Sequence, residues 1–167
     1  MQESASGDNQ QVKVTETEKA WLAGIVDGEG SIRIDVPHGK TGASPRVVVT
    51  NNDWAIIERV VDIGQRVGAN PYVSQRRGKR ENTKDVLVLG MRKIPIFLLA
   101  ILPYLTGQKE KQALLMYRFC EERNKLNVKT LPNDARKYSS RQLGLIQEIK
   151  DAKHTVTQPQ RLNARLS

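Results

Sequence analysis

The stretch that most constrains this chain is Trp21–Gly30, which reads W-L-A-G-I-V-D-G-E-G. Its apolar residues have helical spacing, yet Gly24 and Gly28 lie inside it, and each glycine costs a helix interior about 1 kcal/mol relative to alanine. The stretch ends with Asp27 and Glu29, where a helix carries partial negative charge and normally attracts Lys or Arg. Small residues allow another backbone to approach closely. The sequence therefore predicts a close helix contact and a bound cation in the same place.

The charge of the chain favours a polyanionic partner. Lys and Arg number 27 against 18 Asp and Glu among 167 residues, a net charge of +9, and the basic residues cluster. This balance indicates nucleic acid ahead of a membrane surface. The single cysteine, Cys120, cannot form an intrachain disulfide, which fits an intracellular setting, the cytoplasm of a prokaryote or an organelle. With only His38 and His154, zinc sites and histidine-rich metal sites are disfavoured.

We expect one folded domain over residues 15–154. Residues 1–14 are polar and aperiodic and are expected to form a disordered tail, and residues 155–167 a basic, irregular tail. The longest apolar run, Ile94–Leu105, contains two prolines and is far shorter than the roughly 20 residues of a membrane span. The first residues have no apolar core and no Arg-rich amphipathic face, so no signal or transit peptide is expected.

The periodicity of the apolar residues predicts an α+β fold. Thr15 and Glu18 fit a capping box that begins a helix over residues 16–28. A strand follows over residues 31–37, with Ile32, Ile34 and Val36 on its buried face. The predicted order continues with a strand (46–50), a helix capped by Asn52 or Asp53 and ended by Gly68 (54–67), hairpin strands (72–77 and 85–90) and three helices (95–105, 108–124 and 140–153).

Leu22–Gly30 resembles the signature of the LAGLIDADG homing endonucleases, and the order αββαββα is also that of the family core. The motif matches at Leu22, Ala23, Gly24, Asp27 and Gly30, with conservative or small replacements between them. The resemblance implies a saddle-shaped antiparallel sheet with additional C-terminal helices. Because the motif occurs once, it also implies the homodimeric branch of the family rather than the double-motif monomers.

The resemblance implies a site-specific endonuclease that makes a double-strand break in a long, pseudo-palindromic DNA target and leaves short 3′ overhangs. The implied chemistry is metal-dependent phosphodiester hydrolysis with Mg²⁺, for which Mn²⁺ can substitute, whereas Ca²⁺ binds without supporting cleavage. An RNA-binding intron maturase on the same fold, with or without nuclease activity, stays open as an alternative. A non-catalytic DNA-binding regulator is a third reading, which the retained Glu29 disfavours.

In the family, two motif helices pack across a two-fold axis through small residues, and their acidic ends lie side by side beneath the DNA. The corresponding interface residues here are Ala20, Trp21, Gly24, Ile25 and Gly28. Like charges held this close repel unless a metal neutralises them. By motif position Glu29 is the metal-binding acid and the Gly28 carbonyl a further ligand, whereas Asp27 is expected to have a turn or capping role.

Two further active-site residues follow from the resemblance. Asn51 occupies a position where the family often has a polar residue near the scissile phosphate and its water, although an Asn in the turn before a helix explains it equally well. The segment P-Y-L-T-G-Q-K-E-K-Q-A resembles the stretch that delivers a lysine to the active site. Lys109 fits that residue best and Lys111 is the second choice. A lysine there polarises water or stabilises phosphate charge, whereas the ordinary reading of K-E-K-Q is a solvated helix face.

Strand alternation predicts the DNA-binding face, which lies opposite Ile32 and Ile34. A twisted antiparallel sheet fits the major groove, where Arg reads guanine and Gln reads adenine, and basic residues at a hairpin tip contact phosphates. The predicted contact residues on the strands are Arg33, Asp35, Arg46, Ser74 and Arg76, with Gln75 or Arg77 as alternatives, and those at the hairpin tip are Lys79, Arg80 and Lys84.

Overall fold

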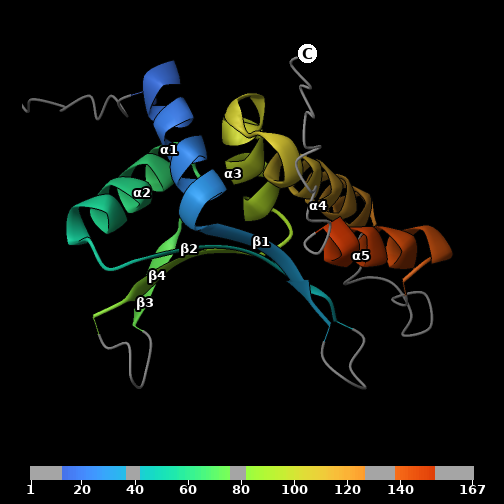
Figure 1. Ribbon diagram of the computed structural model, residues 1–167. Coiled ribbons are helices and arrows are strands. Elements are labelled where there is room, and N and C mark those ends of the chain that lie inside the picture. Colours follow the sequence, from blue (N-terminus) through green and yellow to red (C-terminus); the bar gives the residue numbers. More distant parts are fainter. Residues whose placement is uncertain (1–12, 37–41, 76–81, 127–137, 153–167) are drawn as a thin grey trace, which may run out of the picture.

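A computed structural model describes residues 13–36, 42–75, 82–126 and 138–152. In this part of the chain, the helices lie on one side of a curved sheet and leave its concave face uncovered (Figure 1). None of the described helices is long and apolar enough to cross a membrane. The elements are α1 (Glu16–Glu29), β1 (Gly30–Asp35), β2 (Ser44–Asn51), α2 (Trp54–Arg66), β3 (Tyr72–Gln75), β4 (Lys84–Leu89), α3 (Lys93–Ile101), the 3₁₀ helix η1 (Leu102–Tyr104), α4 (Gly107–Lys125) and α5 (Ser140–Ala152).

The four strands form one antiparallel sheet in the order β1-β2-β4-β3, which confirms the predicted α+β class and the αββαββα order. Gly30 lies opposite Val49, and Val49 in turn lies opposite Val86. Because side chains alternate along a strand, one face is apolar and packs beneath the helices. Its buried residues are Ile32, Ile34, Val47, Val49, Val86 and Val88.

The capping box begins α1 as predicted. The Thr15 N–H donates to Glu18 Oε2 at 2.8 Å, and the Glu18 N–H donates to Thr15 Oγ1 at 3.2 Å. Glu18 also accepts hydrogen bonds from the guanidinium of Arg66, at the end of α2. This ion pair, with the Thr15 contacts, lowers the pKa of Glu18 to about 2. The same residue therefore starts α1 and ties it to α2.

The ends of several elements differ from the sequence-based expectation. Val36 follows the end of β1 and is 38% exposed, so its predicted burial is wrong. The third helix begins at Lys93 rather than Pro95, because the N–H groups of Lys93 and Ile94 both donate to the Gly90 carbonyl at 3.2 Å. Its final turn, from Leu102, is a 3₁₀ helix.

The start and end of α2 follow the predicted pattern. The Asp53 side chain accepts from the Ala55 N–H at 2.9 Å, so Asp53 is the cap rather than Asn52. Gly68 has φ +87°, a left-handed conformation that glycine adopts without a steric penalty. The predicted second helix is therefore confirmed at both ends.

A second capping box begins α5. The Gln142 N–H donates to Ser139 Oγ at 3.2 Å, and the Ser139 N–H donates to Gln142 Oε1 at 3.1 Å. Gln142 is buried, and the Arg123 guanidinium of α4 lies 4.5 Å from the centre of the Tyr138 ring. The Arg123–Tyr138 contact and a hydrogen bond from Arg123 Nη1 to Gln142 Oε1 at 3.5 Å join the start of α5 to α4.

Candidate active site and nucleic-acid interface

The helix α1 passes directly into strand β1. Glu29 is the last helical residue and is exposed, and Gly30 is both the C-cap of α1 and the first residue of β1. The Gly30 N–H donates to the Val26 carbonyl, and a Cβ atom at Gly30 would lie 2.4 Å from that oxygen. Only glycine fits this close approach, so the last glycine of the motif fixes where the helix ends and where Glu29 stands.

The cation expected at the end of α1 comes from another helix. The last turn of α1 contains no basic residue. The half-buried Lys109, in the first turn of α4, donates from Nζ to the carbonyl oxygen of Gly30, directly after Glu29. Its positive charge therefore lies where the helix dipole is negative. Lys111 is exposed two residues further on, so Lys109 is the lysine that reaches the end of the motif.

Asp27 lies at the junction of α1 and α4. Its Oδ2 accepts from the Thr106 N–H at 3.2 Å and from Thr106 Oγ1 at 2.9 Å. Thr106 is the N-cap of α4 and makes no side-chain capping bond of its own, so Asp27 satisfies this helix start from across the fold. This contact agrees with the predicted capping role.

One face of α1 carries only very small residues and faces outward. Ala20, Gly24 and Gly28 are exposed, and a Cβ atom at either glycine would meet nothing within 4 Å. Of the other predicted interface residues, Trp21 and Ile25 are half-buried against the core, and the Arg59 guanidinium lies 4.3 Å from the centre of the Trp21 ring. We call Ala20, Gly24 and Gly28 the glycine ridge.

The predicted metal ligands lie at the lower end of the glycine ridge. Glu29 is exposed, and the Gly28 carbonyl comes after Val26, whose carbonyl accepts the capping Gly30 N–H, so α1 has no later helical N–H for it. A carboxylate and a backbone carbonyl are the hard oxygen donors that Mg²⁺ prefers. Within the described ranges, no group of three or more His, Cys, Asp or Glu side chains could hold a metal. One copy of the chain therefore supplies suitable donors, but few of them.

Asn51 is the last residue of β2 and emerges near the end of α1, because Gly30 lies opposite Val49. Its Oδ1 accepts from the Asp53 N–H at 2.8 Å. The carbonyl half of the side chain thus forms the turn that precedes α2. Of the two explanations for Asn51, the turn role is the one with an observed contact.

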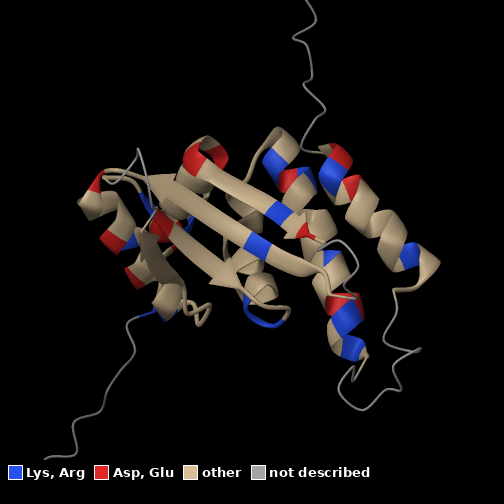
Figure 2. Cartoon of the chain, turned by 90° about the horizontal axis from the view of Figure 1, so that it is seen from below, with Lys and Arg blue, Asp and Glu red and all other residues tan. Residues whose placement is uncertain are grey.

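The concave face of the sheet carries two arginines directly opposite each other. Arg33 on β1 pairs with Arg46 on β2, and Figure 2 shows basic positions on these neighbouring strands. Asp35 lies between them, with Oδ2 2.9 Å from Arg46 Nε and Oδ1 3.9 Å from Arg33 Nε. Like charges directly opposite on a sheet repel, so the Asp35 carboxylate compensates part of the charge of the pair on the predicted DNA-binding face.

The strands β3 and β4 place the remaining predicted contact residues on two different faces of the sheet. Ser74 lies opposite Asp85, which accepts from Thr50 Oγ1 at 2.6 Å, and these three share the concave face. Gln75 and Lys84 are the neighbours of Ser74 and Asp85 in their strands and so point to the helical side, which corrects the expected place of Gln75 on the DNA-binding face. Lys84, predicted at the hairpin tip, is the first residue of β4. Arg76, Arg77, Lys79 and Arg80 lie outside the described residues. No local pattern predicts the Thr50–Asp85 bond, because its partners are 35 residues apart.

The segment from α1 to α3 matches a known sequence family. A family model described as a LAGLIDADG-like domain matches residues 16–101, more than half of the chain. The chain belongs to the LAGLIDADG-like domain family. The match begins with the first residue of α1 and ends with the last residue of α3. A search of curated proteins finds no match.

Solved structures of homing endonucleases have the same fold as this LAGLIDADG chain. I-CvuI in complex with its target in the presence of 2 mM Ca is 21% identical over 82% of each chain, with a TM-score of 0.58. The archaeal intron-encoded homing endonuclease I-Vdi141I, complexed with DNA, is 15% identical over 83% of this chain and 98% of that one, with a TM-score of 0.54. The LAGLIDADG meganuclease I-AabMI, bound to uncleaved DNA, is 18% identical over 79% of this chain but only 43% of that one, with a TM-score of 0.59.

Proposed function

We propose that this protein is a homodimeric, divalent-metal-dependent, site-specific DNA endonuclease of the homing type. Each subunit cuts one strand of a long, pseudo-palindromic target and leaves a short 3′ overhang and a 5′-phosphate. Membership of the LAGLIDADG-like family and a fold shared with homing endonucleases solved in complex with DNA support this proposal.

The observation that carries the proposal is the contact between Lys109 and the Gly30 carbonyl. It brings a cation from α4 to the acidic end of α1, at the residue directly after Glu29, whose side chain is exposed. A lysine beside a carboxylate suits phosphodiester hydrolysis, because developing negative charge on the phosphate needs a positioned cation. Lys109 is therefore assigned to orient water or to stabilise phosphate charge.

The second copy joins at the glycine ridge. Gly24 and Gly28 leave open space, so an equivalent helix can approach closely, and a two-fold arrangement brings two Glu29 carboxylates and two Gly28 carbonyls together. These oxygens would hold the divalent cation, which supplies an activated water and stabilises the leaving oxygen. This chain covers 43% of the I-AabMI chain, which leaves room there for a second unit of similar size.

The concave face binds the duplex. The guanidinium groups of Arg33 and Arg46, whose charge Asp35 partly compensates, lie where an antiparallel sheet faces the major groove, and each is suited to guanine. Asn51, at the end of β2, contributes its amide nitrogen near the scissile phosphate, while its oxygen holds the turn before α2.

The test of the proposed function is Glu29→Gln, which removes the charge of the carboxylate and keeps its size. DNA spanning the insertion junction of the gene, with the intervening sequence removed, serves as substrate. We expect the variant to bind this DNA like the wild type and to cleave at least about 100-fold more slowly. EDTA is expected to stop the wild type and Mg²⁺ to restore it.

Glu148→Gln is the matched control, because it makes the same charge change at an exposed position of α5. It is expected to cleave at the wild-type rate. If Glu29→Gln still cuts both strands as fast as this control, Glu29 is not the metal-binding acid and the assignment is wrong.

A further inference from the structure

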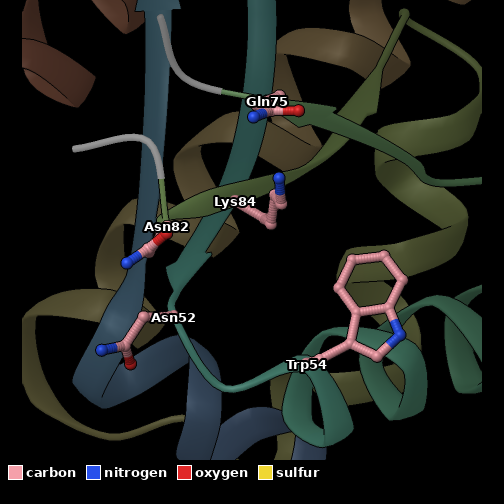
Figure 3. Close-up of a pocket in the computed structure, with 5 residues that line it drawn as sticks. All are labelled: Asn52, Trp54, Gln75, Asn82 and Lys84. Carbon is pink, nitrogen blue, oxygen red and sulfur yellow. The ribbon is translucent and has the colours of Figure 1, made fainter. Parts of the chain in front are cut away.

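A polar pocket lies between the start of α2 and the strands β3 and β4. Asn52, Trp54, Gln75, Asn82 and Lys84 line it, and Figure 3 shows Trp54 on one side of an open space and Asn52 and Asn82 on the other. Its volume is about 600 Å³, within the range of pockets that hold small organic ligands. Gln75 and Lys84 point away from the concave face, and Lys84 lies opposite Asn51, so the pocket adjoins the end of β2 on the helical side of the sheet.

Trp54 is the most unusual residue of the pocket. It is the first residue of α2, and 51% of its surface is exposed although tryptophan is the largest apolar side chain. Its indole Nε1 donates to Glu58 Oε1 at 2.6 Å, one turn further along the helix. This bond satisfies the polar edge of the ring and fixes its orientation, and Figure 3 shows the ring at the side of the open space. The indole ring is therefore held in one orientation and is exposed to solvent.

The other lining residues define the chemistry of the ligand. Asn52, Gln75 and Asn82 each carry a carboxamide, which offers two N–H donors and one oxygen acceptor. Lys84 adds one positive charge, and none of the described residues that line the pocket is acidic. The pocket therefore suits a flat group with both donors and acceptors on its edge and a negative charge attached to it.

We propose that this pocket binds an unpaired nucleotide of a single-stranded nucleic acid. The base stacks on the Trp54 indole, the carboxamides hydrogen-bond its edge, and Lys84 contacts the backbone phosphate. Aromatic side chains and basic residues are the usual platform for single strands. A base inside a duplex is stacked on both sides and cannot enter without leaving the helix. The site goes beyond the proposed cleavage and does not depend on Glu29.

The first test compares Trp54→Leu with Trp54→Phe in full-length protein. The probes are a dye-labelled single-stranded DNA of about 12 nucleotides, an RNA of the same sequence and the DNA duplex, each titrated by fluorescence anisotropy. Salt of about 0.2 M limits binding that depends on charge alone. We expect Trp54→Leu to weaken single-strand binding about 10-fold, which is the loss of one base stack, and Trp54→Phe to retain most of the affinity. Duplex binding should not change.

Leu143→Ala is the control for removing an exposed apolar side chain, because Leu143 is 53% exposed on α5. It should bind all three probes like the wild type. Circular dichroism and the midpoint of thermal unfolding report whether each variant folds. Lys84→Gln provides a second variant, and it should reduce the slope of log K against log salt for single strands by about 0.7.

A single strand that carries one 2-aminopurine gives a direct measure of stacking. Its fluorescence should fall when the wild type binds and should not fall with Trp54→Leu. A stronger effect with the DNA or with the RNA supports the proposal and identifies the source of the nucleotide. The proposal is overturned if folded Trp54→Leu binds single strands like the wild type, or if it loses duplex and single-strand binding equally. Loss of cleavage in Glu29→Gln with single-strand binding intact separates this site from the proposed nuclease.

Discussion

The two faces of α1 differ in whether contacts within one chain explain the residues that they carry. On the inner face, Leu22, Ala23 and Val26 are fully buried against the core. On the outer face, the glycine ridge is exposed, and a Cβ atom at Gly24 or Gly28 would meet none of the described residues within 4 Å. Gly30, at the end of the same helix, has no such freedom, because a Cβ atom there would overlap the Val26 carbonyl.

This contrast separates two reasons for a glycine. Gly30 is required by the fold of one chain, whereas the described contacts of one chain give no reason for Gly24 and Gly28. Glycine inside a helix costs about 1 kcal/mol relative to alanine, so a reason for keeping them must lie outside the monomer. A second copy of α1 is the reason that we propose. Substitutions on the inner face should therefore change the stability of the monomer, whereas those on the outer face should change dimerisation.

The largest expected effect is on the inner face. Leu22→Ala removes buried methyl groups from the closed side of α1, where Leu22 is 0% exposed. Chemical denaturation should show a loss of about 2–5 kcal/mol in the free energy of unfolding. Leu143→Ala, at an exposed position, should change it by less than about 0.5 kcal/mol. An equal loss in both variants would mean that the inner face does not anchor the helix.

The outer face should respond in the opposite direction. Gly24→Leu is expected to raise the free energy of unfolding of dilute monomer by about 0.5–1 kcal/mol, because leucine is the better helix former and meets open space. The same side chain blocks close approach of a second helix, so dimerisation should weaken about 10- to 100-fold in analytical ultracentrifugation.

Gly144→Leu is the matched control for the glycine ridge. Gly144 is an exposed glycine of α5, and a Cβ atom there also meets nothing within 4 Å. It should gain stability by the same mechanism and leave the dimer intact. If Gly24→Leu dimerises as well as Gly144→Leu does, the glycine ridge is not the interface.

The smallest expected effect concerns the start of α1, where Glu18 ties the helix to Arg66. The pKa of Glu18 is about 2, mainly because of the hydrogen bonds from Arg66, and is lower than the value of about 4.3 in an unfolded chain. A depressed pKa stabilises the fold above the unfolded pKa, and this contribution disappears as the pH falls towards 2.

Glu18→Gln should therefore lower the melting temperature at pH 7 and have a progressively smaller effect between about pH 5 and pH 2. Thermal unfolding at a series of pH values measures this difference. In an Arg66→Gln background most of the difference at pH 7 should be absent, because only the capping contacts with Thr15 remain. A difference that stays constant down to pH 2 would contradict the ion pair.

The elements of the fold could be predicted where the signal is local. The capping box of Thr15 and Glu18, the cap at Asp53 and the left-handed Gly68 each lie within a few residues of the helix end that they determine. The predicted burial of Val36 was wrong because alternation alone does not show where strand pairing stops. Asp35 is the last residue of β1 that pairs with β2. The predicted face of Gln75 was wrong for a related reason, since the register that determines which face it occupies comes from its partner strand.

The contacts of the candidate site depend on residues far apart in the chain. Asp27 and Thr106, and likewise Lys109 and Gly30, are 79 residues apart, so no local pattern could pair them. The family resemblance selected Lys109 by position, and its contact with Gly30 supplies a physical reason for preferring it to Lys111. The pocket at Trp54 had no signal in the sequence, because its residues come from a turn, a helix and two strands.

The direct passage from α1 into β1 has a consequence for how a target is measured. Gly30 leaves no connecting residue that could absorb a rotation, so turning α1 about its axis also turns the strand. In the proposed dimer, the packing of the two glycine ridges would then fix the azimuth of each concave sheet around the DNA. One base pair added between half-sites displaces them by about 3.4 Å and turns them by about 35°. The contact between the two glycine ridges, which does not touch DNA, would thus determine the half-site spacing that the dimer accepts.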